Sequence, residues 1–399
     1  MDGQFETIVQ SPPTGTAGAV QHALAAAPEC MWLISLLGDS PLLTGDEVGH
    51  LIDGARGSRA KVTILSCSLP NAGSYGRVER VGDRVIRIVE RKNDDPRHRL
   101  GQTEVNSGIM VLDAAWARDA LLRLPVDAVT GELLLTDLVA LAAAEAKSTD
   151  SHWPVDAVLA DESVAHGVND LVELADVDAI ARRRIRERHM RAGVAIIGPE
   201  TVFIDEDVEI DAGTTILPFS LLRGNTRVGA ASTIGPHTVL DDATVGERVT
   251  VQSSTVRSST VAAGSTIGPY SHLRGGAVLG PNVHVGNYVE MKNAEVGEGV
   301  KCGHLSYVGD ATVGANTNIG AGTITANYDG HEKHRTTIGP DSFIGSGTVL
   351  IAPVEVGEGA RTGAGAVVNR DVPAGKTVVG VPARPIAPRH RDGDKERKR

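Results

Sequence analysis

The chain is poor in cysteine and has no long apolar segment. Its three cysteines, Cys30, Cys67 and Cys302, do not have the spacing of a metal site or a disulfide framework. Such sparse cysteine is typical of a reducing compartment. The opening residues MDGQFETIVQ lack the basic and apolar regions of a signal peptide, and no segment approaches the roughly 18 apolar residues that a membrane helix needs. We therefore expect a soluble, cytoplasmic protein without membrane insertion.

Positive charge and aromatic side chains are also scarce. The 39 basic and 50 acidic residues give a formal net charge of -11, which would repel a phosphate backbone, so nucleic acid is not an expected partner. Aromatic residues make up 3% of the chain, whereas glycine occurs 46 times. A chain of 399 residues is long enough for two domains. With so few rings, the core must be built from small aliphatic side chains, which favours a repeat fold.

An aliphatic side chain recurs at every sixth position in the C-terminal half, with a few one-residue slips. Neither a helix nor an ordinary strand has this period. An inward aliphatic residue followed by a turn residue every six positions is the hexapeptide signature of a parallel β-helix, in which three hexads form one triangular coil. A valine-rich β-sandwich is the alternative, but its strands would alternate with a period of two. The positions are Ile204, Ile210, Ile216, Leu222, Val228, Ile234, Leu240, Val245, Val251, Val256, Val261, Ile267, Leu273, Leu279, Val285, Val296, Cys302 and Val308.

Two further features accompany this period. Glycines follow many of the aliphatic positions, and we expect them to permit tight corners: Gly229, Gly235, Gly268, Gly280, Gly286, Gly309, Gly320, Gly339, Gly345 and Gly357. The period breaks once, between Ile324 and Ile338, where TANYDGHEKHRTT inserts polar and charged residues. Because a coil can extrude a loop without disturbing its neighbours, we expect a protruding, functional loop here.

The N-terminal half has a different pattern. Apolar, strand-like runs at 31–37 and 62–69 alternate with helical stretches such as AGAVQHALAAAP, which predicts an α/β domain with a parallel sheet. The arginine-rich segment DVDAIARRRIRERHMRAG predicts a linker helix with one solvated face. The expected domains are an α/β domain at 1–172, a linker helix at 173–194, a β-helix at 195–385 and a charged tail at 386–399.

Residues 284–339, from HVGNYVEMKN to HEKHRTTIG, closely resemble the bifunctional N-acetylglucosamine-1-phosphate uridylyltransferase / glucosamine-1-phosphate N-acetyltransferase family. The likeness continues more loosely upstream through GDSPL, GSYGRV, IVERKN, EVNSGIM and HGVND. It implies a left-handed parallel β-helix of hexapeptide repeats that transfers an acetyl group from acetyl-CoA to glucosamine 1-phosphate, on the route to UDP-N-acetylglucosamine. Active sites of such prisms form where neighbouring copies pack, so a homotrimer is the expected assembly.

Acetyl transfer to an amine needs a base, a cationic cradle for the sugar phosphate and donors facing the thioester oxyanion. An imidazole is well suited to take up a proton near neutral pH, and the resemblance implies that His304, in CGHLSY, is the catalytic base. The implied amino-sugar-phosphate contacts are Arg274, Lys292, Tyr307, Asn318 and Lys333. The implied acetyl-CoA contacts are Ala321, Asn327, Tyr328, Ser346 and Ala364, and Arg384 joins them from GVPARP, which is similar to the tail of other hexapeptide acyltransferases.

For the N-terminal half the resemblance implies uridylyl transfer from UTP with magnesium. Asp39 and Asn169 match the metal-binding positions, and their oxygen atoms suit that ion. The matching uridine-nucleotide and sugar contacts are Gln10, Gly15, Thr16, Gly76, Glu90, Asn106 and Asn169. The family's Gly-rich phosphate loop has no counterpart, so we expect an incomplete nucleotide-diphospho-sugar transferase-like sheet and impaired uridylyl transfer. Either the start is truncated or misassigned, or the activity has decayed; the exposed edge of an incomplete sheet favours the former.

Two other functions deserve comparison with this one. In the first alternative, the β-helix only trimerises or senses a ligand for an attached sugar-nucleotide transferase, without catalysis, and it then needs no base such as His304. Metal-dependent hydration would need three converging histidines, but His272, His284 and His304 are not spaced to occupy matching positions in successive coils. Acetyl transfer therefore remains the leading hypothesis.

Overall fold

The computed structural model describes residues 6–26, 29–127, 131–147 and 152–386. The chain divides into two compact units, Met1–Ala179 and Ile180–Arg399, and the boundary falls inside helix α5 (Leu171–Arg191). This helix contains most of the segment predicted as a linker. In the described ranges, no helix has the length and apolar character needed to cross a membrane.

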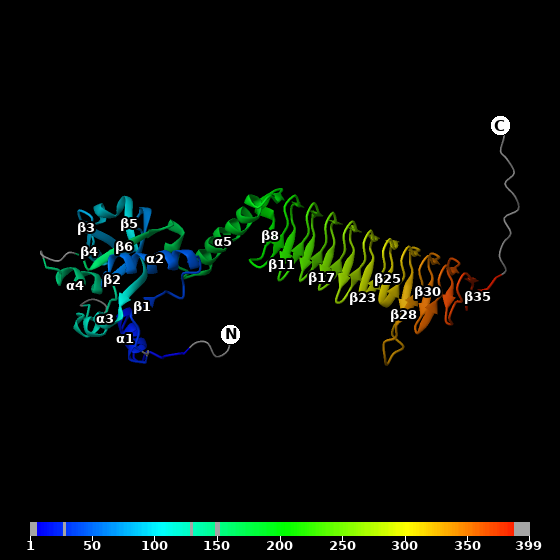
Figure 1. Ribbon diagram of the computed structural model, residues 1–399, viewed down its shortest axis with the longest axis horizontal. Coiled ribbons are helices and arrows are strands. Elements are labelled where there is room, and N and C mark those ends of the chain that lie inside the picture. Colours follow the sequence, from blue (N-terminus) through cyan, green and yellow to red (C-terminus); the bar gives the residue numbers. More distant parts are fainter. Residues whose placement is uncertain (1–5, 27–28, 128–130, 148–151, 387–399) are drawn as a thin grey trace, which may run out of the picture. The chain divides into compact units, whose positions relative to one another are not determined.

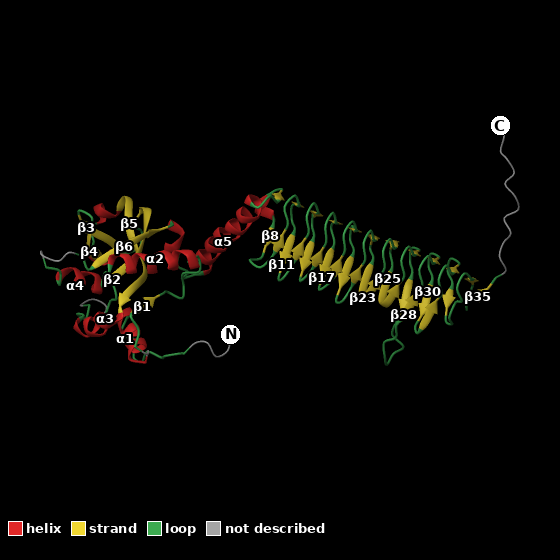
Figure 2. Ribbon diagram, viewed as in Figure 1, coloured by secondary structure: helices red, strands yellow, loops and turns green. Residues whose placement is uncertain are grey.

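The first unit is built on a six-stranded sheet (Figure 2). Strand β5 lies between β2 and β3 and also pairs with β1, while β6 lies at the far side of β2. The strands are β1 (Trp32–Ser35), β2 (Val62–Asn71), β3 (Arg77–Val81), β4 (Arg84–Val89), β5 (Leu100–Asp113) and β6 (Val155–Ala160). The helices are α1 (Thr16–Ala26), α2 (Gly45–Ser58), α3 (Ala114–Ala120) and α4 (Asp137–Ala144).

Alternation along β2 builds a core on each face of this sheet. Ile64 packs in a cluster with residues of α1, α3 and α4, whereas the next residue, Leu65, packs in a cluster with Leu51 and Ala55 of α2. Successive side chains of a strand point to opposite faces, so one strand supports both layers. The sequence pattern therefore identified the α/β class correctly.

The prediction of a parallel sheet was wrong. Only β2 and β6 pair in parallel, while β5 runs antiparallel to β1, β2 and β3, and β3 runs antiparallel to β4. The reason is that, along the chain, β2 and β5 are connected by the β3–β4 hairpin rather than by a helical crossover. Short hairpin connections produce antiparallel neighbours, whereas parallel strands need a long crossover.

The second unit is a left-handed β-helix of stacked triangular coils (Figure 1). Its strands pair in parallel with the coil before and the coil after, apart from the last strand, β35. One sheet contains β7 (Ala195–Ile196), β10 (Thr215–Ile216), β13 (Thr233–Ile234), β16 (Thr250–Val251), β19 (Thr266–Ile267), β22 (His284–Asn287), β24 (Lys301–His304), β26 (Asn318–Ile319), β29 (Phe343–Ile344), β32 (Arg361–Thr362), β34 (Thr377–Val379) and β35 (Arg384–Pro385).

The remaining strands form the other two faces. Those of one face are β8 (Phe203–Ile204), β11 (Leu221–Arg223), β14 (Val239–Asp241), β17 (Thr255–Arg257), β20 (His272–Arg274), β27 (Ile324–Ala326), β30 (Val349–Ile351) and β33 (Val367–Val368). Those of the other are β9 (Glu209–Ile210), β12 (Arg227–Val228), β15 (Thr244–Val245), β18 (Thr260–Val261), β21 (Val278–Leu279), β28 (Thr336–Ile338) and β31 (Val354–Val356). Strands β23 (Glu290–Val296) and β25 (Tyr307–Val313) bend round a corner and contribute to both faces.

The six-residue period predicted this core correctly. Every aliphatic position of the series, and Cys302 with them, is at most 8% exposed and belongs to one continuous cluster. Buried hydroxyl groups near the corners are satisfied by the neighbouring coil; for example, Ser232 Oγ donates to the Gly246 carbonyl oxygen at 2.9 Å, and Ser265 Oγ donates to that of Gly280 at 3.1 Å. Burial and hydrogen bonding thus both lock the coils in register.

The expected role of the glycines was only partly right. Gly235 and Gly268 do adopt positive φ at corners, but most of the glycines that follow the aliphatic positions do not. They are needed because the coils stack closely. A Cβ atom on Gly286 would lie 2.0 Å from the carbonyl oxygen of Gly303 in the next coil. A side chain there would therefore push two coils apart.

Candidate active site

His304 lies at the end of β24, at a corner of the prism. Asn287 is its register partner in the preceding coil. Its imidazole is exposed, and its carbonyl oxygen accepts hydrogen bonds from Ser306 Oγ at 2.8 Å and from the Gly322 N–H at 3.3 Å. Nearby, burial raises the pKa of the Cys302 thiol to about 12, so this cysteine is not a thiolate nucleophile at neutral pH. The group available for proton transfer at this corner is the imidazole.

Three of the predicted acetyl-CoA residues, Ala321, Ser346 and Ala364, stack on the same corner as His304. The Gly322 N–H bonds to the His304 carbonyl, the Gly347 N–H bonds to the Ala321 carbonyl at 2.7 Å, and the Gly365 N–H bonds to the Ser346 carbonyl at 2.8 Å. His304, Ala321, Ser346 and Ala364 therefore occupy one position in successive coils and form a line parallel to the axis. Ala321 is half-buried, whereas Ser346 and Ala364 are exposed. Small side chains leave this edge open to an extended ligand.

Three cationic side chains gather on the face that follows this corner. Arg274 and Lys292 are register partners in adjacent coils, and Arg274 Nη1 lies 3.1 Å from Glu290 Oε1. Lys333 comes from the extruded loop. The nearby ammonium group of Lys333 is the main cause that lowers the pKa of Lys292, and the charge of Arg274 lowers it further. Such mutual repulsion is relieved by a dianion, so the cluster is suited to a phosphate group.

The extruded loop between β27 and β28 stands out from the stacked coils, as predicted (Figure 1). Its first residue, Asn327, is 8% exposed, and Asn327 Nδ2 lies 3.5 Å from Tyr307 Oη. The same amide donates to the Asp310 carboxylate, which also accepts from Asn293 Nδ2 at 2.7 Å. These contacts fix the base of the loop to the coils on which Tyr307 and Lys292 lie.

Asp310 was missed at the level of sequence. Partial burial acts to raise the pKa of its carboxyl, but hydrogen bonds from Asn293 and Asn327 and the charges of Lys333 and Lys292 outweigh it and lower the pKa. The carboxylate therefore remains charged beside the cationic cluster. The signal was a lone acid, three residues after Tyr307, inside a repeat whose neighbouring positions are small or aliphatic.

Two predicted residues lie apart from this group within one chain. Asn318 belongs to β26 and is the register partner of Lys301 and Phe343, on the face that precedes the His304 corner. Arg384 lies in β35, which pairs antiparallel with β34, and its guanidinium bonds to the Ala383 carbonyl at 2.9 Å. The histidines His284 and His304 are not register partners, so the described residues of one chain give no histidine cluster for a metal at this site.

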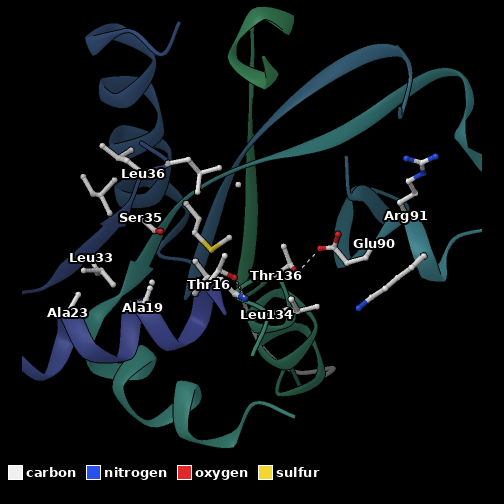
Figure 3. Close-up of a pocket in the computed structure, with 17 residues that line it drawn as sticks. Thr16, Ala19, Ala23, Leu33, Ser35, Leu36, Glu90, Arg91, Leu134 and Thr136 are labelled. Carbon is white, nitrogen blue, oxygen red and sulfur yellow. Dashed lines mark hydrogen bonds between the residues drawn. The ribbon is translucent and has the colours of Figure 1, made fainter. Parts of the chain in front are cut away.

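In the first unit, a cavity of about 920 Å³ brings Thr16 and Glu90 together (Figure 3). Glu90 Oε1 accepts a hydrogen bond from Thr136 Oγ1 at 2.9 Å, and Thr16 Oγ1 accepts one from the Leu135 N–H at 3.0 Å. Most of the other lining side chains are apolar. They come from α1 and β1, from the 36–37 segment after β1, from Met110 of β5 and from the 134–135 segment before α4. The cavity can therefore hold a ligand with an apolar or ring-shaped part.

The other predicted sugar and nucleotide residues lie near its edges. The Asn106 N–H donates to the Gly76 carbonyl at 2.9 Å, and a Cβ on Gly76 would lie 3.5 Å from Glu90 Oε1, so these three positions adjoin. Asn106 Oδ1 is buried and has no hydrogen-bond partner among the described residues. Gln10 Nε2 donates to the Gly15 carbonyl at 3.1 Å, which ties together the segment leading into α1.

The predicted metal ligands approach each other through the backbone. The Val168 N–H donates to the Asp39 carbonyl at 3.0 Å, which brings the 167–169 segment beside Asp39. Asn169 Nδ2 donates to Glu173 Oε2 at 3.0 Å, so the amide oxygen of Asn169 is turned away from that bond. Asp39 is exposed. One carboxylate and one amide oxygen are ligands of the kind that magnesium prefers.

Comparison with known proteins gives two family matches within the β-helix. Residues 197–297 match the GMPPB C-terminal domain, and residues 335–370 match the bacterial transferase hexapeptide (six repeats). Among solved structures, a Francisella novicida UDP-N-acetylglucosamine acyltransferase is 17% identical with a TM-score of 0.36, covering 48% of this chain and 69% of that one. That likeness is too weak to bear on function.

Curated relatives match almost the whole chain. A protein of Desulfitobacterium hafniense (strain Y51) named bifunctional protein GlmU is 39% identical over 94% of this chain and 81% of its own length. The protein of the same name from Bifidobacterium longum is 42% identical, again over 94% of this chain and 81% of its own length. The one from Mycobacterium leprae is 40% identical over 96% of this chain and 77% of its own length.

Proposed function

Because the chain belongs to the family of bifunctional GlmU proteins, we propose that its β-helix transfers the acetyl group of acetyl-CoA to the amine of glucosamine 1-phosphate. One observation supports this assignment most directly: His304 lies on the same corner line as Ala321, Ser346 and Ala364, beside a face that carries three cations. A thioester bound along that line would lie next to His304. A sugar phosphate bound on the cationic face would present its amine both to His304 and to the thioester.

His304 acts as the base in this mechanism. Its neutral imidazole takes a proton from the substrate ammonium group, and the freed amine attacks the thioester carbonyl carbon. The resulting oxyanion lies near the Ser346 hydroxyl, which can donate a hydrogen bond to it. The carbon–sulfur bond then breaks, and the imidazolium gives its proton to the CoA thiolate. The second proton of the attacked nitrogen passes to solvent as the amide forms. The products are N-acetylglucosamine 1-phosphate and free CoA.

Arg274, Lys292 and Lys333 hold the phosphate dianion, and Tyr307 adds a hydroxyl at the same face. Asn318 and Arg384 lie apart from this group in one chain. We propose that the protein is a homotrimer in which a neighbouring copy brings these residues to the site. In such an assembly, Asn327 and Tyr328 of the extruded loop contact acetyl-CoA beside the sugar phosphate.

For the first unit we propose a uridylyltransferase-like domain at 1–172, joined by the linker segment 173–194 to the acetyltransferase domain at 195–385, with 386–399 as a tail, of which residues 387–399 lie outside the described ranges. Thr16, Glu90 and Asn106 would contact the uridine nucleotide and sugar. Asp39 and Asn169 would hold magnesium, which would supply positive charge to the phosphate groups. None of its three cysteines forms a disulfide within the described residues, and we place the protein in a reducing cytoplasm.

The test is to incubate the purified chain with acetyl-CoA and glucosamine 1-phosphate and to measure thiol release and the acetylated sugar by mass spectrometry. Acetyl transfer predicts both products in equal amounts. A β-helix that only trimerises or senses a ligand predicts neither, while still binding its ligand. Release of CoA without sugar acetylation would indicate hydrolysis and would contradict the proposed acceptor.

A further inference from the structure

The extruded loop is a small hairpin whose turn is held by one carboxylate. Tyr328 and Lys333 form an antiparallel bridge, and the His334 N–H donates to the Asn327 carbonyl at 2.8 Å. At the turn, Asp329 Oδ1 accepts from the backbone N–H groups of His331 and Glu332, each at 2.8 Å. The other oxygen, Oδ2, lies 2.7 Å from His334 Nε2.

The Asp329 carboxylate makes three of the polar contacts that hold the hairpin together. The loop extends from the prism and has no apolar core of its own, so its shape depends on such hydrogen bonds. The pKa of Asp329 is lowered, first by the Glu332 N–H, then by the His334 ring and the His331 N–H, so the group remains an acceptor. By contrast, the Glu332 side chain has no hydrogen bond or ion pair with any residue that the structure describes.

Lys333 depends on the contacts of Asp329 for its position. It lies on the hairpin strand opposite Tyr328, and its ammonium group is close enough to Lys292 to lower the pKa of that lysine. Two ammonium groups at contact repel each other, and Asp310 offsets this repulsion only in part. If the hairpin loosened, Lys333 would move into solvent, because its ammonium group is repelled by that of Lys292.

We infer that Asp329 is a positioning residue for the sugar phosphate: its carboxylate holds the 327–334 hairpin so that Lys333 meets Lys292 at the phosphate-binding face. Asp329 itself touches no reacting atom. The inference rests on the proposed acetyl transfer, because it assigns the phosphate of glucosamine 1-phosphate to Lys333. It gives the loop a role in binding the acceptor rather than in proton transfer.

The experiment compares Asp329→Ala with Glu332→Ala, which removes a carboxylate from the same loop without removing the three hydrogen bonds. Asp329→Ala should raise the KM for glucosamine 1-phosphate about tenfold and change kcat by less than about twofold. A tenfold change corresponds to the loss of about one charge-assisted contact. Glu332→Ala should leave both constants near those of the parent. Equal effects of the two variants would overturn the inference.

Two further variants separate positioning from a general structural role. Asp329→Asn keeps an oxygen acceptor for the two N–H groups and should recover part of the lost affinity. In a Lys333→Ala background, Asp329→Ala should raise the KM no further, because the residue acts through Lys333. Additive effects would contradict this. A parent chain that makes no acetylated sugar would instead overturn the proposed function, so the two failures are distinguishable.

Discussion

The amide of Gly322 donates its proton to the carbonyl oxygen of His304, with 3.3 Å between the nitrogen and the oxygen. This bond links the coil that carries the base to the coil that carries Ala321. The same link recurs between Gly347 and Ala321 and between Gly365 and Ser346. Repetition of one backbone contact thus builds an open edge that begins at His304, the proposed base, and runs along the residues proposed to contact acetyl-CoA.

His304→Ala should abolish CoA release in the presence of glucosamine 1-phosphate while leaving the oligomer intact. Removal of a general base costs about 10²–10⁴ in rate, and the exposed imidazole contributes nothing to the buried core. Thiol release and size-exclusion chromatography with light scattering measure the two outcomes. The control is His284→Ala, an exposed histidine on the same sheet whose ring bonds to Thr266. Near-normal turnover in His304→Ala would refute the mechanism.

As pH rises, phosphate binding should weaken at a lower pH than it would with lysines of ordinary pKa. A lysine whose pKa is lowered loses its charge at a lower pH than an ordinary lysine, so the contribution of Lys292 to binding is present below that pKa and lost as pH rises through it. Lys333→Ala removes the main cause and should move this loss to higher pH, despite weaker binding overall. Calorimetric titration with N-acetylglucosamine 1-phosphate avoids the amine of the acceptor. An unshifted or lower transition would contradict the pairing of these lysines.

Gly286→Ala should destabilise the β-helix by about 2 kcal/mol or more, since its Cβ would lie 2.0 Å from the Gly303 carbonyl oxygen and overpacking against backbone is costly. Gly303→Ala is the matched control, because a Cβ there would meet no atom within 4 Å. It should shift stability by less than about 0.5 kcal/mol. Urea unfolding followed by circular dichroism gives both values. Similar losses in the two variants would show that stacking distance is not what requires glycine.

Uridylyl transfer should be weak in the chain as it stands. The cations that line the cavity of the first unit are Arg91 and Lys92, and Lys92 Nζ is already paired with Asp127 at 2.6 Å. Transfer of a nucleotidyl group needs more positive charge on the phosphoryl oxygens than this. Pyrophosphate release from UTP, magnesium and N-acetylglucosamine 1-phosphate measures the activity. A rate comparable with that of acetyl transfer would show the prediction of impairment to be wrong.

The sequence predicted the β-helix well and the first unit less well, for a physical reason. The six-residue period is a local pattern. From Ile204 onward, the aliphatic character of each sixth residue by itself predicts that its side chain is buried. Strand direction is not local: the antiparallel course of β5 depends on the hairpin of β3 and β4, which the alternation of apolar runs does not reveal. The predicted site residues His304, Ala321, Ser346 and Ala364 came from resemblance, and that they share one corner appeared only in three dimensions.

What the amino-acid sequence determined alone is the repeat, its inward aliphatic side chains and the single extruded loop, because periodic burial and its interruption are written in neighbouring residues. The tertiary structure decided which charges meet. Asp310 lies beside Lys292 and Lys333, and Asp329 holds the turn that carries Lys333, through contacts between coils and across a hairpin. The contacts of Asp329 lie within residues 329–334 and are local. The meeting of Lys333 with Lys292 and Asp310 depends instead on the number of residues in each coil and on the path of the loop, so no short stretch of sequence could specify it.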